Sequence, residues 1–151
     1  MNQAFVRIII GSTSDEEKLA PALDVLAQFG VGYDFYVSSA HRDPERTVKL
    51  ATNAAAEGIR VIIAAAGMAA HLPGVIAAHT TLPVIGIPIA SGALNGVDAL
   101  YSIVQMPPGV PVACVGINGA KNAALLAVQI LALQDQELAA KFYAYKEGMK
   151  S

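Results

Sequence analysis

Short apolar runs that alternate with helix-like segments constrain this chain more than any other feature. Runs of Val, Ile and Ala with few polar breaks are typical of strands that helices cover on both faces. We expect five such strands, at 5–10, 33–37, 61–66, 84–87 and 112–115. Because helical periodicity fills the intervals between them, the pattern predicts an α/β fold with a parallel sheet, in a single domain over 1–151.

Local signals predict where several helices begin and end. Ser14 and Glu17 form an S-x-x-E capping box, which predicts a helix start. The pair Asp43-Pro44 combines an N-cap with a proline at the first helical position, and Pro88 is expected to close the fourth strand. The first two helices are expected to end at Gly30 and Gly58, and further helices are expected at 73–79, 97–104, 120–133 and 135–149. The last of these is amphipathic and charged, and we expect it to pack on a neighbouring subunit.

The distribution of apolar residues along the chain argues against a membrane protein. The hydrophobic share of 54% is rich in alanine, which indicates close helix packing and surface buried between subunits. The longest weakly polar run, 61–78, is interrupted by His71, Pro73 and two glycines, so it is a poor spanning helix. The apolar segment near the amino terminus is short, contains Arg7 and lacks a cleavage pattern. We therefore expect a cytoplasmic protein without a membrane partner.

Charge and cysteine usage narrow the classes further. The formal charge of -2 and the absence of a basic cluster argue against a nucleic-acid partner, which requires Lys and Arg gathered on one face. The single cysteine, Cys114, lies in an apolar run and is expected to be a core residue. One thiol cannot form an internal disulfide, which suits a reducing compartment.

Three polar loops follow the first three apolar runs, at 11–15, 38–44 and 67–74. The carboxyl ends of parallel strands face one crevice, so we expect these loops to surround one ligand. The first loop leads into a helix amino terminus, which favours an anion such as phosphate. It is neither a Walker loop nor G-x-G-x-x-G. Asp15 would repel a phosphate at contact distance, so its expected partner is a ribose hydroxyl. The alternative to a ligand site in this loop is that Ser14 only caps the helix.

The second loop carries His41 beside Arg42. A guanidinium offers a planar fork to phosphate, and an imidazole titrates near neutral pH, so one residue can hold a ligand while the other moves a proton. His71 in the third loop is a proton carrier, a donor to the substrate or a structural residue, and the sequence slightly favours the structural role. The three histidines lack ligand spacing with a carboxylate, so we expect no metal.

Five sequence blocks resemble, in order and spacing, those of the N5-carboxyaminoimidazole ribonucleotide mutase family of purine biosynthesis. The blocks are Gly11–Asp15, Ser39–Pro44, Ala69–Gly74, Ser102–Pro107 and Asn118–Ala123, and the resemblance covers nearly the whole chain. Ala65 and Met68 stand where the family commonly has glycine, and Glu16 stands where it often has tryptophan.

The resemblance implies a three-layer, flavodoxin-like sandwich that assembles as a homo-octamer and needs no cofactor. It implies that His41 is the general acid and base. The substrate-binding residues it implies are Ser12, Ser14, Asp15, Ser39, Ala40, Arg42, Gly67, Ala69, Ala70, His71 and Leu72.

The implied reaction moves a carboxylate from the exocyclic amine of N5-carboxyaminoimidazole ribonucleotide to a ring carbon. A carbamate loses carbon dioxide once its nitrogen is protonated, and the aminoimidazole that remains is an enamine-like carbon nucleophile. We expect His41 to protonate the nitrogen, the third loop to retain the gas and the same imidazole to remove the ring proton.

Two alternatives remain at this point. A carboxylase of the same family would use free carbon dioxide and aminoimidazole ribonucleotide, although the intact block Ala70–Gly74 favours the mutase. A non-catalytic module that binds a phosphorylated ligand is the other, because Ala65 and Met68 depart from the family pattern.

Overall fold

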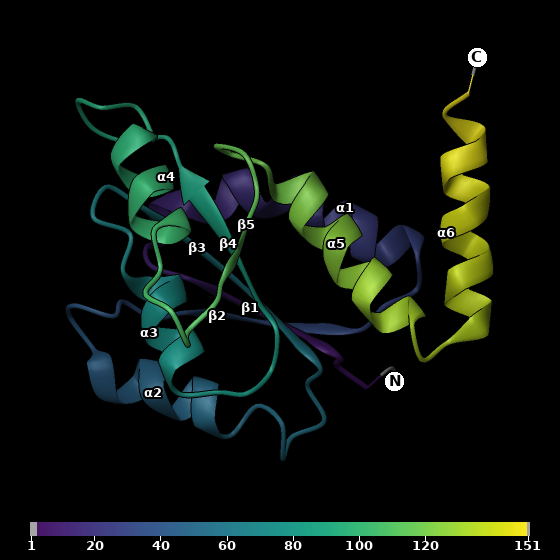
Figure 1. Ribbon diagram of the computed structural model, residues 1–151, viewed down its shortest axis with the longest axis horizontal. Helices are drawn as coiled ribbons and strands as arrows, with labels where there is room; N and C mark the ends of the chain where they lie inside the picture. The colour runs from purple at the N-terminus through teal and green to yellow at the C-terminus, as the bar shows by residue number, and fades with distance from the viewer. Residues whose placement is uncertain (1–2, 151) are drawn as a thin grey trace.

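A five-stranded parallel sheet lies between two layers of helices in the computed structural model, which describes residues 3–150 (Figure 1). Residues 1, 2 and 151 of the expected domain lie outside this part. The strand order is β2-β1-β3-β4-β5, which confirms the three-layer flavodoxin-like class. The strands are β1 (Val6–Ile10), β2 (Tyr33–Val37), β3 (Val61–Gly67), β4 (Val84–Ile89) and β5 (Ala113–Cys114). The helices are η1 (Thr13–Leu19, a 3-10 helix), α1 (Ala20–Gln28), α2 (Pro44–Thr52), α3 (Leu72–Ala78), α4 (Val97–Val104), α5 (Ala120–Ala132) and α6 (Gln136–Gly148).

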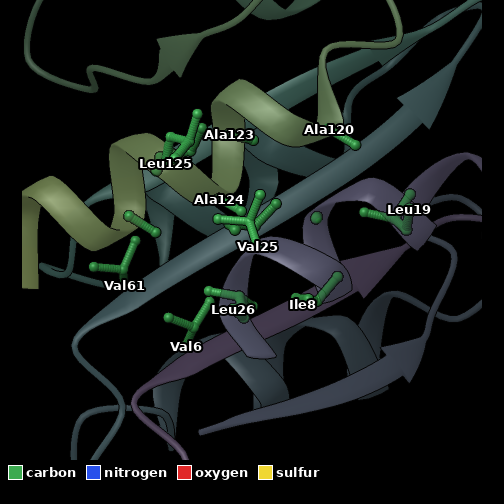
Figure 2. Packing of buried hydrophobic residues seen from close by; sticks show 14 of the residues in the cluster. Val6, Ile8, Leu19, Val25, Leu26, Val61, Ala120, Ala123, Ala124 and Leu125 are labelled. Atoms are coloured by element: carbon green, nitrogen blue, oxygen red, sulfur yellow. The ribbon is translucent and has the colours of Figure 1, made fainter. Parts of the chain in front are cut away.

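The central strands are buried along almost their whole length, and apolar except at Arg7, because helices cover both of their faces. Every residue of β1 and β4 is buried, as is β3 up to its last residue. On one face α1 and α5 pack against side chains such as Ile8 and Ile63 (Figure 2). Alanines of α5 lie directly over the sheet there, and their small side chains allow the helix to approach it closely.

Helices α2, α3 and α4 cover the other face of the sheet (Figure 1). Ile9, Ile62 and Ala64 point to this side and contact residues of the three helices. Gly86 in β4 has no side chain, and a methyl group there would lie 2.5 Å from Ile103 Cγ2 and 3.3 Å from the Pro73 ring. A glycine at this position therefore sets how closely α3 and α4 approach β4.

Arg7 is the one charged residue inside β1, and it is only 1% exposed. Its Nη2 and Nε donate to the Asp34 carboxylate at 2.9 and 3.0 Å, and its Nη1 donates to Glu57 Oε1 at 3.2 Å and to a backbone carbonyl. Burial alone lowers the pKa of the guanidinium, but these carboxylates outweigh it and raise that pKa. The buried charge therefore ties β1 to β2 and to the segment after α2.

The predicted capping box of Ser14 and Glu17 is wrong. Ser12 is the N-cap, and its Oγ accepts a hydrogen bond from the Ser14 amide at 3.3 Å. A 3-10 helix follows, and the α-helix begins only at Ala20. The tighter 3-10 turn directs Asp15 inward, whereas an α-helix capped by Ser14 would have started two residues later.

The prediction that Pro88 closes the fourth strand is also wrong, because β4 continues to Ile89. Pro88 pairs with Ala66, and its carbonyl accepts from the Asn118 amide at 2.8 Å. The backbone nitrogen of Pro88 points to the same side as its carbonyl, away from β3 and beyond the end of β5. The missing amide hydrogen of Pro88 therefore costs the β3–β4 ladder no hydrogen bond. The fifth strand is shorter than 112–115, and α2 ends at Thr52, since turns fill the interval to Gly58.

Helix α6 packs on its own chain through an aromatic cluster. The rings of Phe142 and Tyr145 lie 5.9 and 5.7 Å from the ring of Phe29. The opposite side of the helix is exposed at Tyr143, so its contact with a neighbouring subunit stays a prediction. Among residues 3–150, no helix has the length and apolar character needed to cross a membrane.

Replacing Gly86 by alanine is expected to destabilise the protein by about 1–3 kcal/mol, because the added methyl group overpacks the contact with Ile103. Gly116→Ala is the matched control, since a methyl group at Gly116 meets open space. Urea unfolding of both variants measures the effect. Equal free energies of unfolding for Gly86→Ala and the control would contradict this account of the packing.

Candidate active site

The loops that follow β1, β2 and β3 meet at one edge of the sheet, as the parallel topology requires. Backbone hydrogen bonds join them beyond the last paired residues. The Ser38 amide donates to Ile10 O at 2.8 Å, and the Gly11 amide donates to Ala65 O at 3.1 Å. The three loops therefore start from fixed positions relative to one another.

A cavity of about 440 Å³ opens between these loops. Eleven of the twelve site residues predicted from the sequence line it. They are Ser12, Ser14, Asp15, Ser39, Ala40, His41, Arg42, Gly67, Ala69, His71 and Leu72. The twelfth, Ala70, is buried beneath the third loop and does not line the cavity.

Four lining residues were not among the predicted site residues. Gly11 and Met68 lie within the predicted loops, whereas Ala66 and Ser91 lie outside them. Ser91 comes from the end of β4, and a methyl group on Gly67 would lie 3.1 Å from its Cβ. Ser91 is the first residue with a hydroxyl group after the fourth apolar run. A predicted fourth strand that continued through Pro88 would have placed Ser91 in the loop at its carboxyl end.

The second loop is held by its own side chains. Ser39 Oγ accepts from the Arg42 amide at 3.1 Å, and the Ser38 and Thr47 hydroxyls lie 2.7 Å apart in a buried contact with α2. Arg42 Nη2 reaches across to the first loop and donates to Gly11 O at 3.1 Å. This bond ties the second loop to the first and leaves the rest of the guanidinium facing the cavity.

His41 and His71 form a hydrogen-bonded pair between the second and third loops. His41 Nε2 lies 2.7 Å from His71 Nδ1, and the two rings are nearly perpendicular, at 89°. One imidazole donates and the other accepts in this contact. Both side chains are exposed to the cavity, which leaves His41 Nδ1 and His71 Nε2 open to a ligand.

Asp15 is the buried acid of the site, with 8% of its surface exposed. Burial raises the pKa of its carboxyl, and the nearby Lys18 ammonium opposes part of that rise. Beside it, the hydroxyls of Ser12 and Ser14 lie 2.9 Å apart. This part of the cavity offers hydrogen-bond acceptors and hydroxyls, which is the chemistry that recognises a sugar.

The third loop turns at Met68, which has a positive φ of 55° and an exposed side chain. This left-handed conformation is the reason a glycine suits the position. Ala65, the other departure from the family pattern, is fully buried in the core on the α1 and α5 side, so its methyl group takes no room from the cavity. Within residues 3–150, the amides of Ala69 and Ala70 donate no hydrogen bond.

No cluster of three or more His, Cys, Asp or Glu within the described part of the chain is arranged to hold a metal ion. Cys114 does not line the cavity; it is half-buried in β5, and burial raises the pKa of its thiol. The polar chemistry of the site is therefore that of imidazole, guanidinium, carboxylate, hydroxyl and backbone amide groups.

Comparison with known proteins agrees with this geometry. The family model of AIR carboxylase matches residues 5–151. The N5-carboxyaminoimidazole ribonucleotide mutase of Pyrococcus abyssi is 59% identical over 96% of this chain and 83% of its own. The corresponding mutase of Saccharolobus solfataricus is 55% identical over 97% and 92%.

Among solved structures, Treponema denticola PurE superimposes with a TM-score of 0.86 at 33% identity, over 95% of this chain and 89% of the other. The resemblance stated from the sequence blocks is therefore confirmed. This chain belongs to the AIR carboxylase family.

Proposed function

We propose that this chain is a mutase that converts N5-carboxyaminoimidazole ribonucleotide to 4-carboxyaminoimidazole ribonucleotide in purine biosynthesis. The observation that carries the proposal is the His41–His71 pair, which lies at 2.7 Å inside a cavity lined by hydroxyls, a buried acid and an arginine. Proton transfer beside a bound ribonucleotide is the chemistry that this set supports.

The charged groups of the cavity indicate where the phosphate, the ribose and the base of the substrate bind. Arg42 supplies a fork for phosphate at the junction of the first two loops. Asp15 accepts hydrogen bonds from ribose hydroxyls, with Ser12 and Ser39 beside it. The base then lies toward His41 on the remaining side of the cavity.

His41 carries one proton through the whole cycle. As imidazolium it protonates the exocyclic nitrogen, the bond from that nitrogen to the carboxyl carbon breaks, and carbon dioxide and aminoimidazole ribonucleotide form. The ring carbon attacks carbon dioxide to make the new carbon–carbon bond. His41 then removes the proton from that ring carbon and returns to its starting form, so the reaction balances without a cofactor.

His71 is a positioning residue for His41 in this scheme. A hydrogen bond of 2.7 Å between the two rings fixes the orientation of the His41 imidazole, which would otherwise rotate freely on an exposed loop. The same contact joins the second loop to the third. His71 therefore holds the proton carrier next to the wall that receives carbon dioxide.

The third loop retains the released gas. The unpaired amide of Ala69 gives a carbon dioxide oxygen a hydrogen-bond donor, and the small side chains of Ala66 and Ala69 leave room beside it. Because the gas stays next to the nucleophile, recapture is intramolecular and gains from effective concentration.

Replacing His41 by asparagine is expected to lower turnover by at least about 10²-fold while the ribonucleotide still binds, because the proton carrier is lost. Absorbance at the product's ultraviolet band and calorimetric binding measure the two effects. His79→Asn is the matched control, since the His79 side chain hydrogen-bonds, among the described residues, to a carbonyl of its own helix alone. Near wild-type turnover of His41→Asn would remove the histidine from its assigned role.

The mutase and the carboxylase alternative differ in whether the reaction needs free carbon dioxide. In buffer depleted of bicarbonate, the protein is expected to convert N5-carboxyaminoimidazole ribonucleotide at its full rate and to leave aminoimidazole ribonucleotide unchanged. Conversion of aminoimidazole ribonucleotide when bicarbonate is added, with N5-carboxyaminoimidazole ribonucleotide left unconverted in the depleted buffer, would identify a carboxylase instead. Absence of conversion from either substrate would favour the non-catalytic binding module.

Assembly as a homo-octamer in the cytoplasm is part of the proposal. Val97, Tyr101 and Val104 form an exposed apolar stripe along the outer side of α4, with Tyr101 62% exposed. A second copy of the chain is a fitting cover for such a stripe. Light scattering is expected to give eight times the mass of one chain; a monomer would contradict this part of the proposal.

A further inference from the structure

A second, smaller hollow adjoins the catalytic cavity between the first and second loops. It measures about 340 Å³ and is lined by residues 11–13 and 37–39 together with Arg42, Asp43 and Arg46. Gly11, Ser12, Ser39 and Arg42 line both hollows. A ligand in the cavity can therefore extend past Arg42 into the smaller hollow.

The charged groups of the smaller hollow are two arginines and one aspartate. Asp43 Oδ1 caps α2 by accepting from the Arg46 amide at 3.3 Å, so its charge is offset by the helix amino terminus. The net charge of this lining is positive, which favours an anion.

The Arg46 side chain is held on the wall of the hollow by two contacts. Its Nε donates to Val37 O at 3.3 Å, and its guanidinium carbon lies 5.9 Å from the centroid of the Tyr36 ring. Across residues 3–150, its two terminal amino groups make no hydrogen bond. The guanidinium is therefore oriented in advance and keeps its donors for a ligand.

Arg42 alone is an incomplete phosphate site. One of its terminal amino groups already donates to Gly11 O. A phosphate monoester carries a charge of about -1.5 to -2 at neutral pH and three acceptor oxygens. A second guanidinium close by would meet the oxygens and the charge that Arg42 leaves uncompensated.

We propose that Arg46 is a second phosphate-binding residue, which holds the substrate phosphate in the smaller hollow together with Arg42. The inference rests on the proposed function, because the phosphate is that of the ribonucleotide. It orders the substrate along the site: phosphate between the two arginines, ribose near Asp15 and base at His41. It also keeps the phosphate away from the buried Asp15 carboxylate.

The test compares two probes that differ only in the phosphate, 5-aminoimidazole ribonucleotide and its riboside. Calorimetry gives their dissociation constants for the wild type, for Arg46→Gln and for Lys49→Gln. Lys49 is the matched control because it is a cation on the same helix that lines the neighbouring hollow together with Arg46 but does not line the smaller hollow. Arg46→Gln is expected to weaken the ribonucleotide by about 10-fold or more and to leave the riboside unchanged. Lys49→Gln is expected to change neither.

Four outcomes would overturn the inference. Unchanged ribonucleotide affinity in Arg46→Gln would show that Arg46 does not touch the phosphate. Equal weakening of both probes would show that it acts on loop structure instead. A wild-type protein that binds the riboside as tightly as the ribonucleotide would overturn any phosphate site, and one that binds neither would overturn the proposed function as well.

Discussion

The parallel pairing of β1 with both β2 and β3 is the constraint on which the rest of the molecule depends. Ile10 lies opposite Val37 on one side and opposite Ala65 on the other, so β1 and β2 end at one level and β3 continues two residues further, to Gly67. The chain leaves the sheet there three times, and each exit carries polar residues. A slip of one residue in either register would turn every side chain of a strand to the opposite face and separate the loops.

The sheet and the loops divide the work of the protein. Helices cover both faces of the sheet, so the strands provide a rigid base. The one charged side chain inside β1, Arg7, is paired with the carboxylates of Asp34 and Glu57. The loops carry exposed groups held by short hydrogen bonds, such as the one between His41 and His71. Two imidazoles, an arginine and a buried acid therefore converge although 56 residues separate Asp15 from His71.

Much of the fold and the site could be predicted from the sequence because both depend on local patterns. Apolar runs identified the strands, and the polar loops after them were expected to surround one ligand. The resemblance to the mutase family implied the individual site residues, eleven of which line the cavity. The errors arose where contacts between residues distant in sequence determine the local structure. Pro88 remains in β4 because β5 is too short to require its missing amide, and Ser91 was missed for that reason. The burial of Arg7 depends on Asp34 and Glu57, and the contact of His41 with His71 spans 30 residues, so no local pattern reveals either.

The central claim is that the three strand-end loops bind one ribonucleotide with its base at the His41 imidazole. A crystal structure of the protein with 5-aminoimidazole ribonucleotide tests it most directly. The account predicts that the aminoimidazole ring lies within hydrogen-bond distance of His41, about 3 Å, with the ribose beside Asp15. A complex in which the ring lies outside the cavity, or at its far side from His41, would contradict it.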